Sequence, residues 1–248
     1  RRALGAHGMT PNPHSVGSAT ASTALTALTA ETLRPLGRHC GLRVSPLSIG
    51  TWLTFGSRLT RRDAAELLSE ACAAGVVLFD TAAGYGPSEA ALGRALADSG
   101  VDREDVVISA KMFPRCTLAR KHLRATMQRS LDRLGLDFVD VITCHRYDPD
   151  TPLVEVVHTM SEFVTTGLAH YWGTSFWTVE QIRAAREYAE ATGLHPPVCA
   201  QPGYSLGQRR VVEVDYAPLV AEGHGLMTFS PVGFGLLSGR YIDGVPTG

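Results

Sequence analysis

The chain has 248 residues, 44% of them hydrophobic, and a formal net charge of −1 at pH 7. This length suits a single α/β barrel with a large core. The near-neutral charge gives no reason to expect nucleic acid or an anionic membrane as a partner, and no apolar stretch approaches the length of a membrane span.

The cysteines indicate a reducing compartment. Five occur, an odd number without a Cys-x-x-Cys pair, at positions 40, 72, 116, 144 and 199. A disulfide framework or a zinc site is not expected from this pattern, which fits the cytoplasm best. Cys144, beside His145, is either a nucleophile or a small buried strand residue, and the second interpretation is favoured.

Residues 1–31 differ in composition from the remainder. They are rich in Ala, Ser, Thr, Gly, Pro and His, contain no acidic residue before Glu31 and lack the apolar core of a secretory signal. We expect a flexible tail, either a tag remnant before a natural start at Met9 or a transit-like extension, in which residues 20–32 have helical character. Residues 32–248 are then one domain.

The predicted elements begin with a hairpin, whose arms are residues 33–37 and 42–45. A strand is expected at 47–51, and then a helix at about 61–74 that Thr60 caps and Gly75 ends. Further strands are expected at 76–80, 105–111, 138–144, 169–174, 197–201 and 226–230. Further helices are expected at about 88–98, 118–134, 152–166, 179–192 and 212–222.

Strands and helices alternate throughout, which favours parallel strands joined by crossover helices. Two folds fit, a barrel and an open doubly wound sheet. The open sheet would need a Gly-rich turn after the first strand, and neither 50–56 nor Gly233-Phe234-Gly235 has that spacing. We therefore predict an α/β fold, a (β/α)8 TIM barrel with an N-terminal β-hairpin, and expect its C-terminal strand and helices to be missing from this chain.

Four chemically active residues follow the early strands of this barrel. Asp80 ends the apolar run 76–80, Tyr85 lies in the next loop, Lys111 ends the run 106–111, and His145 ends the run 139–145. The carboxyl ends of barrel strands point into one mouth, so these four side chains should meet there. Taken singly, each has an ordinary explanation as a turn cap, a surface aromatic, a strand-end lysine or a core histidine.

Together the four suit proton donation to a carbonyl oxygen while another group donates a hydride. A tyrosine hydroxyl has a pKa of about 10, and a neighbouring ammonium group lowers it. Since a buried amine needs a carboxylate, Asp80 and Lys111 are expected to pair beside Tyr85. His145, opposite, would hydrogen-bond the substrate oxygen.

Several segments resemble the aldo-keto reductase superfamily, in particular the branch that contains the β subunits of voltage-gated potassium channels. They are residues 50–56, 78–82, 171–175, 230–231 and 238–241. The resemblance runs from about 33 to 245. It implies a (β/α)8 barrel that binds NADPH across its mouth and reduces carbonyls, with Asp80, Tyr85, Lys111 and His145 as the catalytic set and Tyr85 as the proton donor.

The same resemblance implies a set of cofactor-binding positions. They are Thr51, Trp52, Asp80, Ser175, Gln201, Phe229, Ser230, Pro231, Val232, Gly233 and Arg240. Thr51 and Trp52 would line the nicotinamide end, Ser175 and Gln201 would hydrogen-bond its amide, residues 229–233 would wrap the pyrophosphate, and Arg240 would face a phosphate. The loops that follow the strands should shape the substrate pocket, with Phe113, Tyr147, Phe176 and Trp177 as walls; no metal is expected.

Three departures from the channel-like branch matter. His145 stands where channel β subunits usually have asparagine, and it resembles the working reductases. Phe176 replaces an arginine common in that branch. The residues that would hold the adenosine 2′-phosphate belong to the expected missing C-terminus, so the choice of NADPH (NADP+) rests on the resemblance and on Arg240.

The leading hypothesis is an NADPH-dependent reductase of a ketone or an aldehyde. Only two of the 23 basic residues are lysines, a bias typical of GC-rich genomes, which suggests a tailoring ketoreductase of bacterial antibiotic, polyketide or deoxysugar biosynthesis. The alternatives are a channel-β-like NADPH-binding regulatory subunit, a nucleotide-sugar enoyl reductase and a degenerate, cofactor-free barrel. By resemblance, a homo-oligomer, either a tetramer or an octamer, is expected.

Overall fold

The computed structural model describes residues 33–112, 117–242 and 244. Within them lie a two-stranded antiparallel hairpin and a seven-stranded parallel sheet. The hairpin consists of β1 (Arg34–Pro35) and β2 (Arg43–Val44). The sheet strands, which pair in chain order, are β3 (Ser48–Gly50), β4 (Leu78–Ala82), β5 (Val107–Met112), β6 (Val139–Cys144), β7 (Ala169–Ser175), β8 (Cys199–Gln201) and β9 (Gly225–Leu226).

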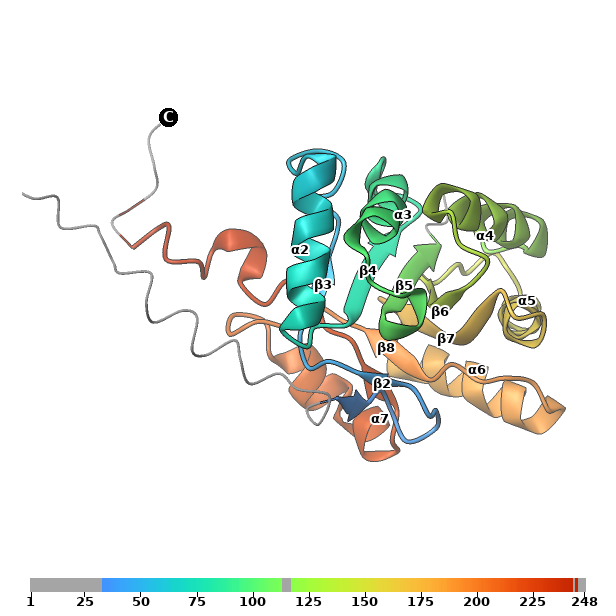
Figure 1. Ribbon diagram of the computed structural model, residues 1–248. Coiled ribbons are helices and arrows are strands. Elements are labelled where there is room, and N and C mark those ends of the chain that lie inside the picture. Colours follow the sequence, from blue (N-terminus) through green and yellow to red (C-terminus); the bar gives the residue numbers. More distant parts are fainter. Residues whose placement is uncertain (1–32, 113–116, 243, 245–248) are drawn as a thin grey trace, which may run out of the picture.

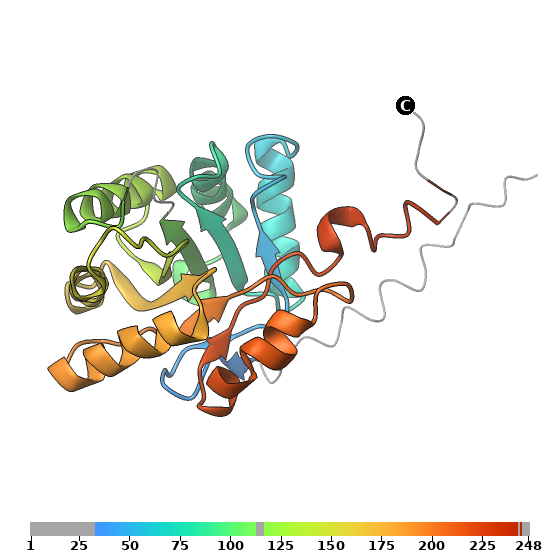
Figure 2. The same ribbon diagram turned by 180° about the vertical axis from the view of Figure 1, so that it is seen from behind.

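Helices cover the outer face of the curled sheet (Figures 1 and 2). They are α2 (Arg61–Ala73), α3 (Ser88–Ser99), α4 (Arg120–Leu134), α5 (Leu153–Thr165), α6 (Val179–Thr192) and α7 (Ala217–Ala221). Thr60 and Thr178 each form a capping box at the start of α2 and α6, which satisfies backbone donors that a helix start leaves free.

Side chains along each strand alternate between the face that packs against the helices and the face that points into the barrel. Phe79, Ile108 and Ile142 are fully buried in the cluster formed with the helices. Their neighbours Leu78, Val107 and Val141 belong to a second apolar cluster inside the barrel. Two residues further along each strand, the interior side chains become polar, so the sequence places its reactive groups at the carboxyl ends.

The hairpin fills the opposite, N-terminal end of the barrel. Leu36 and Val44 are 4% and 8% exposed and pack in the same interior cluster as Leu78 and Val107. The hairpin is therefore a plug beneath the polar mouth rather than an appendage.

Among the described residues, β3 and β9 are the two edges of the sheet. The order, the parallel pairing and the outer helices are those of a (β/α)8 barrel with seven of its strands in place, as predicted. A cavity of about 430 Å³ beside the hairpin is lined from both edges, by Ser48 on β3 and Leu226 on β9. An eighth strand between these edges would close the barrel.

Several element boundaries differ from the prediction. The strand expected at 76–80 lies at 78–82, because Val76 donates its N–H to Ala71 in the turn that ends α2. Asp80 is thus mid-strand. The helix expected at 212–222 is a π-helical turn, Val211–Asp215, followed by α7; Pro218 lies in the first turn of α7, where a missing N–H is tolerated.

The last predicted strand is also shorter than expected. Residues 226–230 were expected to be extended, but β9 ends at Leu226, and only an isolated bridge joins Gly203 to Phe229. Ser230 has a left-handed φ of 57°, and Pro231 follows it. A left-handed residue does not continue a strand, and a proline cannot donate a hydrogen bond to a neighbouring strand.

Candidate active site

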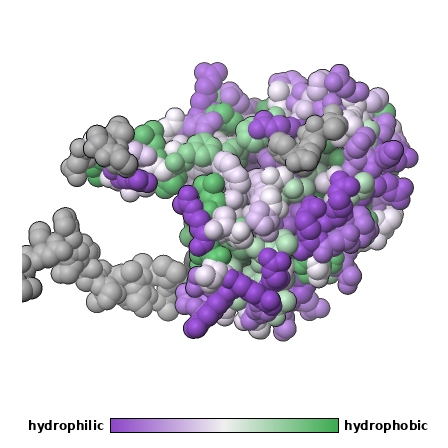
Figure 3. Space-filling model, turned by 90° about the horizontal axis from the view of Figure 1, so that it is seen from above, coloured by the Kyte–Doolittle hydropathy of each residue, from purple (hydrophilic) through white to green (hydrophobic). Residues whose placement is uncertain are grey.

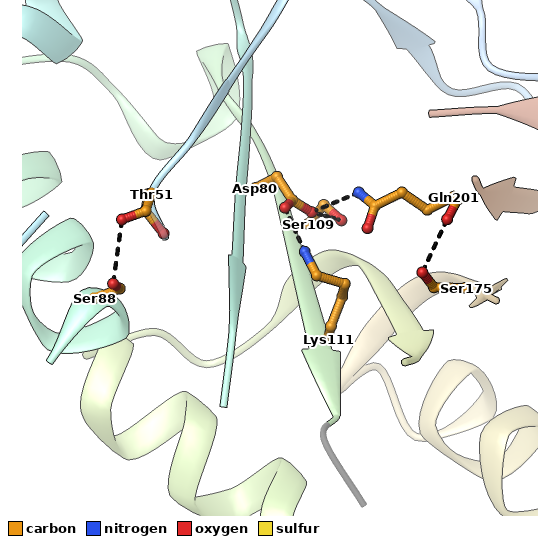
Figure 4. A network of polar contacts seen from close by, with 7 residues as sticks. All are labelled: Thr51, Asp80, Ser88, Ser109, Lys111, Ser175 and Gln201. Atoms are coloured by element: carbon orange, nitrogen blue, oxygen red, sulfur yellow. Dashed lines mark hydrogen bonds and ion pairs between the residues drawn. The ribbon is translucent and has the colours of Figure 1, made fainter. Parts of the chain in front are cut away.

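Asp80 is at the centre of the polar cluster in the mouth (Figure 4). Its Oδ2 accepts a hydrogen bond from Lys111 Nζ, with which it forms an ion pair, and its Oδ1 accepts from Ser109 Oγ at 3.1 Å and from Gln201 Nε2 at 3.0 Å. The contact with Gln201 crosses the barrel from β4 to β8. Lys111 is 1% exposed, so its charge depends on this carboxylate for compensation.

Tyr85 lies in the turn after β4, next to Lys111. The Lys111 Nζ is 5.0 Å from the centroid of the Tyr85 ring. The charge and hydrogen bonding of Lys111 lower the pKa of the phenol, but burial raises it more, and Asp80 adds to the rise, so the pKa is raised above its ordinary value of 10. The expectation of a net lowering is therefore wrong, because desolvation of a phenolate outweighs the nearby ammonium group.

His145 follows β6 directly and faces Tyr85 from another side. The two rings are 6.2 Å apart and nearly perpendicular, at 84°. Burial, followed by the charges of Lys111 and Arg146, lowers the pKa of His145 to about 4, against a smaller opposing effect of Asp80. The imidazole is therefore neutral at physiological pH and suited to hydrogen-bond a carbonyl oxygen without carrying a charge.

The loop after β3 places an aromatic ring over the phenol. Trp52, 53% exposed, stacks against Tyr85 at 5.9 Å between centroids and 29° between planes, and meets Phe234 edge-on at 6.3 Å. Ser88, at the start of α3, donates to the carbonyl oxygens of Tyr85 at 3.0 Å and of Thr51 at 3.2 Å (Figure 4). This serine ties the two loops of the site together.

Ser175 and Gln201 are neighbours at the carboxyl ends of β7 and β8. They are paired in register, and Ser175 Oγ donates to the Gln201 carbonyl at 2.9 Å. Both are buried, at 1% and 5% exposure. These residues line the mouth beside Asp80, to its right in Figure 4, where Lys111 lies below it.

Phe176 forms an aromatic wall just beyond β7. Its ring is 6.2 Å from His145 and 5.3 Å from Phe229, and the Arg146 guanidinium carbon is 4.5 Å from its centroid. Its φ of 55° is left-handed, an unusual conformation for a bulky residue that surrounding contacts must maintain.

The other expected pocket walls are placed differently. Trp177 is 2% exposed within the core, with Tyr147 edge-on at 4.9 Å and the Tyr216 hydroxyl donating to its carbonyl. It is a packing residue, because the chain turns inward after Phe176 to start α6. Tyr147 is half-buried against it, and Phe113 lies outside the described residues.

The predicted phosphate-binding segment leaves the body of the barrel. Phe229 contacts Phe176, whereas residues 236–242, red in Figure 1, reach past α2 in both ribbon views. Pro231 and Val232 are exposed, and so is Arg240 on the outer part of this segment. The structure therefore does not bring Arg240 to the Asp80 cluster. Leu236 and Ile242 are 68% and 83% exposed, and apolar surface follows the extended segment in Figure 3.

Four contacts of the site were not expected from sequence. Ser109 could have been found, since it lies two residues before Lys111 and so on the same face of β5. Arg146, Ser88 and Phe234 carry no local signal, because their roles arise from loops that meet only in the fold.

Two general searches bear on other kinds of site. Within residues 33–112, 117–242 and 244, no group of three His, Cys, Asp or Glu side chains could hold a metal ion. No helix of the described chain is long and apolar enough to cross a membrane. The four described cysteines, among them buried Cys144, are free thiols, and burial raises the pKa of the Cys144 thiol.

Comparison with known proteins agrees with this geometry. A "probable voltage-gated potassium channel subunit beta" from Oryza sativa subsp. japonica is 44% identical over 218 residues, a match that covers 84% of this chain and 66% of that relative, just under two thirds of its length. The model of the aldo/keto reductase family matches residues 46–248. A seven-stranded parallel barrel sheet with these matches shows that the chain belongs to the aldo/keto reductase family.

Proposed function

We propose that this protein is an NADPH-dependent reductase that converts a ketone or an aldehyde to an alcohol. The observation that carries the proposal is the position of Tyr85, whose ring centroid lies 5.0 Å from Lys111 Nζ and 6.2 Å from the centroid of the His145 ring. Bound NADPH supplies a hydride to the carbonyl carbon. Overall, one carbonyl, one NADPH and one proton give one alcohol and one NADP+.

The residues present fit a nicotinamide carboxamide. The adjacent Ser175 hydroxyl and Gln201 amide offer both donors and acceptors at one edge of the mouth. Thr51 Oγ1 is buried and has no hydrogen-bond partner among the described residues, which leaves a polar group for a ligand to satisfy. These three residues would hold the nicotinamide end.

Side chains of the protein then transfer one proton to the substrate. Tyr85 gives its phenolic proton to the carbonyl oxygen, which neutral His145 orients by a hydrogen bond. The raised pKa of Tyr85 keeps the donor protonated at neutral pH. Lys111, held by Asp80, stabilises the phenolate that remains until solvent returns the proton. General acid assistance of this kind contributes roughly 10²–10⁴ in rate.

The test is the Tyr85→Phe variant, assayed through NADPH absorbance with benzaldehyde and diketone substrates. We expect kcat to fall at least about 100-fold, while NADPH binding, followed by fluorescence, is retained. Ser175→Ala and Gln201→Ala should instead weaken NADPH binding. Turnover that survives in Tyr85→Phe would refute the assignment of the proton donor.

A second candidate is a channel-β-like regulatory subunit that binds NADPH and a partner protein. The 44% identity to the rice protein favours it. Tight cofactor binding without turnover of any carbonyl would support this candidate over the first. Reduction of a conjugated C=C bond in a nucleotide sugar, and a tailoring role in bacterial biosynthesis, remain predictions from sequence that the comparisons do not support.

Three organisational proposals accompany this function. Residues 32–248 form the reductase domain. The protein assembles as a tetramer or an octamer. It acts in the cytoplasm on a small-molecule carbonyl.

A further inference from the structure

Arg146 is a charged side chain at the mouth that the proposed reaction does not use. It follows His145 directly and is exposed. Its guanidinium carbon lies 4.5 Å from the centroid of the Phe176 ring, and its charge reaches far enough to depress the pKa of His145. The cation is therefore close to the group that would hold the substrate oxygen.

The charge of Arg146 is not balanced by its neighbours. The nearest carboxylate in sequence, Asp148, is turned inward, where it accepts hydrogen bonds from the Leu118 N–H at 2.7 Å and the Thr151 hydroxyl at 2.6 Å. Asp80 is paired with Lys111. None of the ion pairs formed within the described residues includes Arg146.

Phe176 restrains this cation beside an apolar surface. A guanidinium over an aromatic face is held by the ring, while the N–H groups at its edge stay available for a second partner. Phe176 is itself fixed by its contact with Phe229 and remains 47% exposed. The mouth thus offers a preorganised cation next to an exposed aromatic ring.

We propose that the substrate is a carbonyl compound that carries a carboxylate, bound with the carboxylate on Arg146 and its carbon skeleton on Phe176. The inference rests on the proposed reductase function and names its substrate class. An arginine fork matches a carboxylate with two parallel hydrogen bonds, which would orient the carbonyl toward Tyr85 and His145.

The experiment compares 4-carboxybenzaldehyde with its neutral methyl ester, methyl 4-formylbenzoate. We expect wild type to prefer the acid, and Arg146→Leu to lower kcat/KM for the acid roughly 10- to 100-fold, the loss of a charge-assisted hydrogen bond, mainly through KM. The ester should be unaffected. Arg146→Lys should recover part of the loss, and Arg129→Leu on the outer face of α4 should behave as wild type.

The outcomes separate the two claims. Wild type that reduces neither these aldehydes nor the benzaldehyde and diketones of the first assay refutes the reductase, whereas wild type that reduces only the latter refutes the carboxylate-binding role. Wild type that reduces both equally, or an Arg146→Leu variant that loses both equally, refutes only the carboxylate-binding role. A parallel fluorescence titration with NADPH shows whether an equal loss comes from cofactor binding, in which case Arg146 serves the cofactor and the inference fails.

Discussion

Asp80 joins three side chains that differ in chemistry, an ammonium group, a hydroxyl and an amide. Because its partner Lys111 is almost wholly buried, the carboxylate is needed for stability as well as for the proposed reaction. The interaction with Gln201 spans 121 residues of sequence. No local sequence pattern indicates such a long-range contact. The sequence therefore predicted the Asp80–Lys111 pair but not the hydrogen bonds of Asp80 with Ser109 and Gln201.

We expect Asp80→Asn to lower the free energy of unfolding by about 3–5 kcal/mol, because it leaves the Lys111 ammonium buried without a counter-charge. The double variant Asp80→Asn/Lys111→Met should be more stable than Asp80→Asn alone. Urea unfolding at neutral pH measures both. Additive losses in the double variant would contradict the pairing.

At the scale of elements, periodicity predicted all seven sheet strands and most helices, since the core requires apolar faces with those periods. Periodicity was wrong where local backbone geometry determines the structure. β9 ends before Ser230, which has a left-handed backbone, and the helix predicted at 212–222 is divided into a π-helical turn and α7. The wall residue Phe176 was named, but its left-handed backbone was not visible in the sequence. The pKa of Tyr85 was misjudged because burial around a loop residue depends on several loops at once.

The contact between β7 and β8 gives an element-scale prediction. A Cβ on Gly173 would lie 2.6 Å from Cys199 Sγ and 2.7 Å from the Cys199 carbonyl oxygen. We expect Gly173→Ala to lower the free energy of unfolding by about 3 kcal/mol through overpacking of adjacent strands.

The matched control for this variant is Gly100→Ala at the end of α3. Gly100 has a φ of 71° and open space around its Cβ position, so only the left-handed backbone opposes the change, at about 1 kcal/mol. Thermal or urea unfolding compares the two. Equal losses would show that the close approach of β7 and β8 is not what requires Gly173.

At the scale of the whole molecule, two buried histidines make stability depend on pH. His145 lies at the mouth and His224 at the hairpin end, near Arg186, His39 and Glu222 and against the Cys199 carbonyl; burial is the first cause that lowers each pKa from 6.5 to about 4. Between about pH 4 and pH 6.5, the unfolded chain therefore binds more protons than the folded chain. Stability is full above about pH 6.5 and is lost as pH falls toward 4.

We expect the free energy of unfolding to drop by at least about 2 kcal/mol between pH 7 and pH 5. His224→Asn should reduce this dependence, whereas His122→Asn, an exposed position on α4, should leave it unchanged. Urea unfolding at the two pH values provides the measurement. A pH dependence unaltered by His224→Asn would assign the acid sensitivity elsewhere.

The plug formed by Leu36 and Val44 has a kinetic consequence. With that end packed, the polar residues at the carboxyl ends of the strands are reached from the mouth, which both reactants of the proposed reaction would have to share. Ser175 and Gln201 are buried in the mouth, whereas Trp52 and Phe176 are about half exposed. If the proposed reaction holds, a nucleotide on Ser175 and Gln201 would have to bind first and leave last, after the alcohol product has departed.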